Sequence, residues 1–127
     1  MKYDPSVQPD AKHWLALDEQ ERIRLAAVYH RKARIKLPSA KAHACFHAIV
    51  ENQIAAQVES VVRAMSRLMK EGLSRHDALH AIGSVLADQL YEAAQSQGQD
   101  SSETAQARYD AAVERLTARE WRRKFED

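Results

Sequence analysis

The sequence predicts an all-α protein, built as an up-and-down four-helix bundle with an additional C-terminal helix. The 127-residue chain contains only 3 glycines and 3 prolines, so it has few of the turn signals that separate short strands. Alanine, leucine, glutamate, arginine and glutamine, which favour helices, are abundant. The apolar residues recur at steps of three and four, the spacing of a helix that buries one face.

The beginning of the chain is predicted to be an extended arm. Pro5 and Pro9 disfavour a helix there, and the apolar residues show no helical period. Trp14 belongs to a short apolar segment just before the first helix. The expected organisation is an N-terminal arm, a helical bundle domain, and a linker with an amphipathic C-terminal helix, at residues 1–17, 18–96 and 97–127.

The first helix of the bundle is predicted to follow Asp18 and to run to about residue 35. Asp18 with Glu21 three residues later is a capping pair, and Pro38 prevents the helix from continuing. Basic residues near its end complement the negative end of the helix dipole. We prefer this interpretation to a phosphate-binding patch for Arg31, Lys32, Arg34 and Lys36.

Ser39 is expected to cap the second helix, at residues 40–56, and a break near residues 57–60 precedes the third helix, at residues 61–71. Gly72 favours a helix end. Apolar residues at helical spacing form the buried faces of these two helices. They are Phe46, Ile49, Val50 and Ile54, then Val61, Val62, Met65, Leu68 and Met69.

The fourth helix is predicted over residues 75–96, after a second capping pair of Ser74 and Asp77. Gly83 inside this helix indicates the close approach of a neighbouring helix. A fifth helix is predicted over residues 103–124. Because its single apolar stripe follows a flexible linker and needs a surface to cover, it suggests self-association or a protein partner. The stripe is Ala105, Tyr109, Ala112, Val113 and Leu116.

Composition narrows the partners and the location. The 19 basic and 18 acidic side chains nearly balance, which argues against nucleic acid or an anionic membrane as a partner. The polar N-terminus does not resemble a signal peptide, and no apolar run approaches the roughly 18 residues of a membrane span. The single Cys45 cannot form an internal disulfide and fits a reducing compartment. We therefore expect a cytoplasmic protein.

The most distinctive pattern is two pairs of histidines, each pair spaced four residues apart and thus on one helical face: His43 and His47, and His76 and His80. Glu51 follows the first pair by one turn, and His30 lies near the end of the first helix. Because short connections make neighbouring helices antiparallel, these histidines are predicted at one end of the bundle.

Metal binding would use such a cluster. Two imidazoles four residues apart on a helix can hold one ion, so the two pairs supply four candidate ligands. Glu51 and His30 are candidates for a fifth ligand or for the shell behind the ligands. These donors suit zinc, iron, nickel or manganese, and no organic cofactor is predicted. For an enzyme, hydrolysis by a metal-activated water would be the natural reaction.

Two other interpretations stay open. The histidines can form a hydrogen-bonded polar core in a structural or interaction protein, or a metal-free catalytic or small-ligand pocket. The spacing matches neither the His-Glu-x-x-His motif nor the Glu-x-x-His repeats of di-iron bundles. Cys45 falls on the face opposite the histidines, and His13 is expected at the surface.

The order of these motifs resembles a family of short bacterial proteins classed as a domain of unknown function. Its pattern is His-x-x-x-His, a glutamine six residues later, and then His-x-Ala-x-His-Ala. Here the pattern runs through His43, His47, Gln53, His76, Ala78, His80 and Ala81. The resemblance covers roughly residues 20–96, and the proline-rich break of the relatives is missing. It implies an all-helical bundle with its polar residues kept together, and it implies no particular activity.

Overall fold

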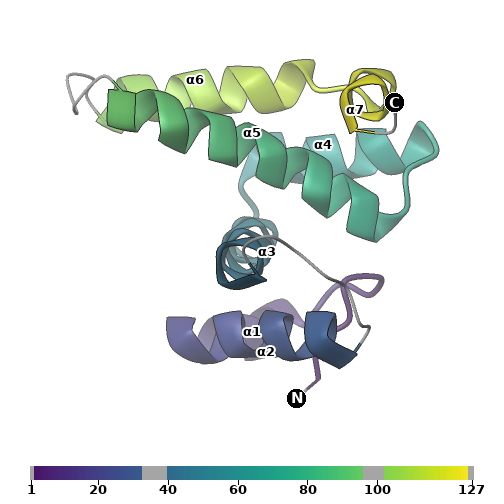
Figure 1. Cartoon of the computed structure of the whole chain (residues 1–127), viewed down its shortest axis with the longest axis vertical. Helices are drawn as coiled ribbons and strands as arrows, with labels where there is room; N and C mark the ends of the chain where they lie inside the picture. The colour runs from purple at the N-terminus through teal and green to yellow at the C-terminus, as the bar shows by residue number, and fades with distance from the viewer. Residues whose placement is uncertain (1, 33–39, 96–101, 126–127) are drawn as a thin grey trace.

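A computed structural model describes residues 2–32, 40–95 and 102–125 of the chain. The described residues form seven helices and no strand (Figure 1), which confirms the all-α prediction. The helices are α1 (Ala11–Ala16), α2 (Glu19–Lys32), α3 (Ala40–Ala55), α4 (Glu59–Lys70), α5 (Arg75–Gln95), α6 (Ser102–Arg115) and α7 (Ala118–Phe125). None of them is long and apolar enough to cross a membrane.

Helix α3 separates two groups of helices. In Figure 1, α1 and α2 lie on one side of α3, whereas α4, α5 and α6 lie on the other. Helix α3 contacts α1 and α2 as well as α4 and α5, and α6 packs on α4 and α5. The up-and-down arrangement of four helices is not confirmed, because α3 is seen end-on while α2 and α5 run across the view (Figure 1).

Each group of helices has its own core, and α3 contributes to both. Ala44 and Ala48 of α3 are buried with Trp14 and Leu25 in the core against α1 and α2. The second core joins α3, α4, α5 and α6, and it includes Val50, Ile54, Val61, Leu68, Ile82 and Val113. Burial on both sides of α3 positions its polar residues between the two groups.

The N-terminal segment is not extended throughout, because it contains α1. Asp10 caps this helix and accepts a hydrogen bond from the backbone N–H of His13. Pro9 precedes the cap, where a proline does not interrupt helical hydrogen bonds. The side chain of Trp14 has no exposed surface, and its Nε1 donates to Oδ1 of Asn52 at 2.8 Å.

The capping predictions are confirmed where the structure describes them. Oδ1 of Asp18 accepts from the backbone N–H of Glu21 at 2.8 Å, and Oγ of Ser74 accepts from that of Asp77 at 3.0 Å. Gln57 has a positive φ of 59° at the predicted break between α3 and α4. The predicted stop at residues 37–38, the cap at Ser39, and Arg34, Ile35 and Lys36 lie outside the described residues.

The prediction of one continuous helix over residues 103–124 is wrong, because α6 ends at Arg115 and α7 begins at Ala118. Oγ1 of Thr117 accepts from the backbone N–H of Glu120, and Oε1 of Glu71 accepts from that of Ala118 at 2.8 Å. These acceptors satisfy the free N–H groups of a new helix start. Tyr109, Val113 and Leu116, from the predicted docking stripe, are buried in the chain's own core.

Candidate metal centre

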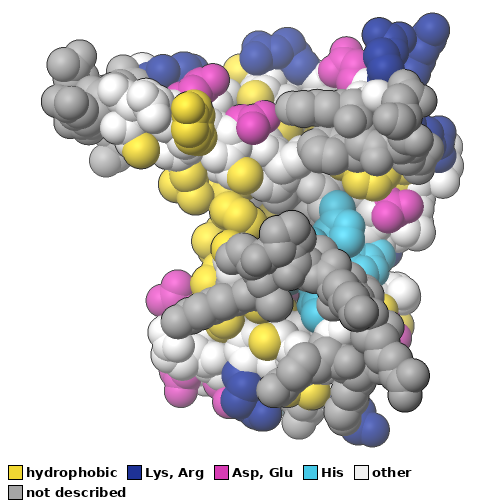
Figure 2. Space-filling view, viewed as in Figure 1, with side chains coloured by type: hydrophobic (Ala, Val, Ile, Leu, Met, Phe, Trp, Pro, Cys, Tyr) yellow, Lys and Arg dark blue, Asp and Glu magenta, His cyan; other side chains and the backbone are white. Residues whose placement is uncertain are grey.

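Three helices bring five histidine side chains together. One lies near the end of α2, two lie in α3, and two lie in the first turns of α5. One ligand nitrogen of each lies within 4.8 Å of the others. These residues, His30, His43, His47, His76 and His80, are called the histidine cluster below. Figure 2 shows histidine side chains gathered between the two groups of helices.

The sequence spacing explains why the cluster forms. Four residues is about one turn of a helix, so each pair in α3 and α5 projects from one face. Helix α3 packs on both α2 and α5, which brings His30 to the same place from the other side. The predicted convergence of these five residues is therefore found in the structure. His13 lies elsewhere, exposed and beside Asp10.

His47 occupies the middle of the cluster. Its Nε2 lies 3.1 Å from Nε2 of His43 and 3.1 Å from Nε2 of His80. Its Nδ1 lies 3.0 Å from the hydroxyl oxygen of Tyr3, which donates its own proton to Oε2 of Glu51 at 2.7 Å. The tyrosine oxygen therefore accepts from Nδ1–H of His47, and Nε2 of His47 carries a lone pair.

His30 is held in the same tautomer. Its Nδ1 lies 2.7 Å from the carbonyl oxygen of Ala26. Because a carbonyl oxygen only accepts, Nδ1 carries the proton and Nε2 carries a lone pair. This Nε2 is buried and has no hydrogen-bond partner among the described residues, and the same holds for Nε2 of His76.

These contacts place more imidazole nitrogens around Nε2 of His47 than its lone pair can serve in hydrogen bonds. The single lone pair of Nε2 in His47 cannot accept two good hydrogen bonds, although two imidazole nitrogens lie 3.1 Å away. Two nitrogens that each lie about 2.1 Å from one ion, at coordination angles of about 90 to 110°, are themselves about 3.0 to 3.4 Å apart. The observed separations therefore match neighbouring ligands of one cation.

Burial favours the neutral form of the four imidazoles in α3 and α5. Loss of solvent, with a smaller effect of neighbouring histidines, lowers the pKa of His43 to about 4 and that of His80 to about 3. The pKa values of His47 and His76 are also lowered, again mainly by burial. A neutral imidazole has the free lone pair that metal binding requires.

A buried ion pair supports the cluster from behind. Arg75 donates from Nη1 to Oε2 of Glu51 at 2.9 Å and from Nη2 to Oε1 at 2.7 Å. Its Nη1 also donates to the carbonyl oxygen of Pro5 at 2.8 Å. The Glu51 side chain is only 1% exposed, and Tyr3 connects it to His47. Of the two roles predicted for Glu51, this geometry is that of a residue behind the ligands.

Sequence reasoning missed Tyr3 and Arg75. Tyr3 lies in a segment without helical period, so no local pattern predicts its contact with a residue more than forty positions away. Arg75 is the first residue of the predicted fourth helix, and no sequence pattern marks it as the partner of Glu51. Glu51 could have pointed to a cationic partner. It adjoins the apolar face of its helix, and a carboxylate buried there needs a cation beside it.

Comparison of the chain with protein-family models, curated proteins and solved structures found no match. The resemblance to a domain of unknown function therefore stays a prediction from the motifs.

Proposed function

We propose that this protein binds one transition-metal ion through the histidine cluster, with Nε2 atoms as ligands. The observation that carries the proposal is the position of Nε2 of His47, a lone-pair nitrogen that faces two other imidazole nitrogens at 3.1 Å. The unpartnered Nε2 atoms of His30 and His76 support it. A cation among these nitrogens would bind the lone pair of each of them.

The kind of ligand atom limits which metals suit the site. All atoms of the cluster that are within reach of one ion are imidazole nitrogens, and Glu51 is engaged by Arg75 and Tyr3. Imidazole suits zinc, iron and nickel, whereas manganese prefers carboxylate and water oxygens. We therefore rank manganese below the other three metals. Five ligands exceed the usual four of structural zinc, which favours an ion with higher coordination such as iron or nickel.

The alternative of a metal-free polar core fits the contacts less well. In such a core, buried imidazole nitrogens have hydrogen-bond partners, yet two in this cluster have none among the described residues. A protein partner at residues 103–124 would have to contact exposed residues of α6 or α7, since Tyr109 and Val113 are buried. The cytoplasmic location stays a prediction.

Elemental mass spectrometry on untagged protein, purified without chelators, tests the proposal. We expect one equivalent of a transition metal in the wild type, and its loss in a His47→Ala/His80→Ala variant. His13→Ala is the matched control, because it removes an exposed histidine outside the cluster, and it should keep the metal. A wild type that stays metal-free after dialysis against zinc, iron and nickel would overturn the proposal.

A further inference from the structure

A cavity of about 260 Å³ lies directly against the histidine cluster. Three members of the cluster, His43, His47 and His80, form part of its wall. The rest of the wall is mostly apolar and comes from α3, α5 and α7, through Phe46, Leu79, Gly83, Ala87 and Trp121.

The wall of this cavity is polar only at the end that the imidazoles form. Apart from the imidazoles, no described residue of its wall is ionisable. Ser84 is the remaining polar residue, and its hydroxyl donates to the carbonyl oxygen of Ala81 at 2.6 Å, within its own helix. A charged group at the end remote from the imidazoles would therefore lose its hydration without gaining a partner of opposite charge.

The fold creates this space in two ways. Gly83 has no side chain, and a Cβ atom built there would lie 3.8 Å from Cβ of Phe46. The break at Thr117 lets α7 turn away from α6 and lie on the side where α5 begins (Figure 1), which brings Trp121 to the cavity. Pockets for drug-sized ligands are about 300 to 1,000 Å³, so this one fits a smaller molecule.

We propose that the cavity admits a small uncharged molecule, with a donor atom toward the metal and an apolar body about the size of one aromatic ring against Phe46, Leu79 and Trp121. This inference rests on the proposed function, because the ion binds the donor atom. An open position of the ion would face the cavity, because His43, His47 and His80 line it, whereas His30 and His76 do not.

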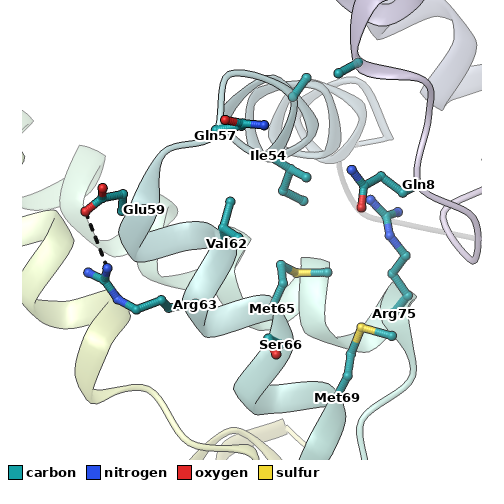
Figure 3. Close-up of a pocket in the computed structure, with 12 residues that line it drawn as sticks. Gln8, Ile54, Gln57, Glu59, Val62, Arg63, Met65, Ser66, Met69 and Arg75 are labelled. Carbon is teal, nitrogen blue, oxygen red and sulfur yellow. Dashed lines mark hydrogen bonds and ion pairs between the residues drawn. The ribbon is translucent and has the colours of Figure 1, made fainter.

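A second, larger cavity of about 670 Å³ does not touch the cluster (Figure 3). Its wall combines the apolar Ile54, Val62 and Met65 with the charged Glu59 and Arg63. Nothing in the structure shows what covers this surface, so no ligand is assigned to it.

Cobalt-loaded protein gives a direct test, because the visible spectrum of cobalt(II) responds to a new ligand. The probes are 4-phenylimidazole, which is neutral and carries a phenyl ring beside its donor imidazole, and 4-(imidazol-4-yl)benzoate, whose carboxylate lies at the far end of the phenyl ring and cannot reach the ion. We expect 4-phenylimidazole to bind the wild type about tenfold more tightly or better, since the carboxylate would lose its hydration at the apolar end of the cavity. The metal-free protein should bind neither probe.

Gly83→Leu should fill the cavity without removing a histidine. We expect it to keep cobalt and to weaken 4-phenylimidazole about tenfold or more. Tyr91→Leu is the matched control and should stay close to the wild type, because Tyr91 is an exposed residue of α5 that does not line the cavity. Ala87→Leu, one turn further along α5, should repeat the effect of Gly83→Leu if that variant fails to bind cobalt.

The outcomes separate the two proposals. A wild type that binds no cobalt overturns both the metal site and the cavity inference. Cobalt binding with no preference for the neutral probe overturns the cavity inference alone. The same conclusion follows when both leucine variants bind the probe like the wild type, or when the metal-free protein binds it equally well.

Discussion

Arg75 and Glu51 form a buried ion pair between α5 and α3, with N–O distances of 2.7 and 2.9 Å. Arg75 directly precedes His76, and Glu51 follows His47 by one helical turn. The pair therefore fixes the start of α5 against α3 beside the histidine cluster. Both side chains are nearly inaccessible to solvent, at 8% and 1% exposure, so the loss of either partner leaves an uncompensated charge.

Arg75→Met should lower the free energy of unfolding by about 3 to 5 kcal/mol, because the Glu51 carboxylate stays buried without its cation. Chemical denaturation followed by circular dichroism measures the change. Arg63→Met is the control, since Arg63 pairs with Glu114 at the surface, and it should cost far less than Arg75→Met. Equal losses in the two variants would contradict the structural role of the buried pair.

Tyr3→Phe should weaken metal binding about 10- to 100-fold, the usual effect of losing a group that orients a metal ligand. Phenylalanine keeps the ring that packs against Trp14 but no longer accepts from Nδ1–H of His47. Competition with a chelator of known affinity measures the loss. Tyr109→Phe removes a hydroxyl that donates to Gln53 instead, and it should leave metal affinity unchanged. An equal effect of both substitutions would argue against a specific role for Tyr3.

The metal-free protein should lose stability as the pH falls. The pKa values of His43 and His80 in the folded chain, about 4 and about 3, lie below the ordinary value of 6.5. The unfolded chain therefore takes up more protons below pH 6.5, so the contribution of the neutral rings is full above that pH and is lost as the pH falls through these folded-state values. Thermal unfolding across this range measures it.

A His43→Gln/His80→Gln variant is the control for that experiment, because glutamine does not titrate. Its melting temperature should fall less steeply between about pH 7 and about pH 4 than that of the wild type. Identical slopes would mean that other groups cause the acid sensitivity.

The two helix-associated glycines should respond to alanine in opposite directions. Gly72 has a φ of 103°, which alanine adopts only with strain, so Gly72→Ala should destabilise the chain by about 1 to 2 kcal/mol. Gly83 lies inside α5 with room for a Cβ, so Gly83→Ala should stabilise it by about 0.5 to 1 kcal/mol. Paired denaturation curves test the signs, and destabilisation by both would show that α3 and α5 pack more tightly than described.

The pairing of the histidines was predictable because it depends on a local rule. Spacing of four residues places His43 with His47 and His76 with His80 on single faces, whereas the packing of α2 and α5 on α3, and not an up-and-down bundle, brings the pairs together. The same rule did not reveal that α3 is buried on two sides. Ala44 and Ala48, which pack against α1 and α2, are too small to stand out as an apolar stripe.

Other features depend on contacts between distant segments. The split between α6 and α7 follows from Thr117 and from Glu71, which accepts from the backbone of Ala118 across the fold. Because the apolar stripe continues through the sequence, it predicted one helix without a break. The place of Tyr3 depends on the partners that α3 and α5 offer it, so residues 1–10 alone contain no signal for it.

The ligands of the proposed ion span the chain from His30 to His80 and belong to both groups of helices. An ion held by all of them would act as a cross-link that closes long loops, a task that disulfides perform in other small proteins. With Cys45 as its only cysteine, this chain has no covalent means of doing so. Folding and metal loading would then be one coupled equilibrium. In a cell that lacks the metal, the protein would be present in its less stable, metal-free form. Proteases would then degrade it faster than the metal-bound form.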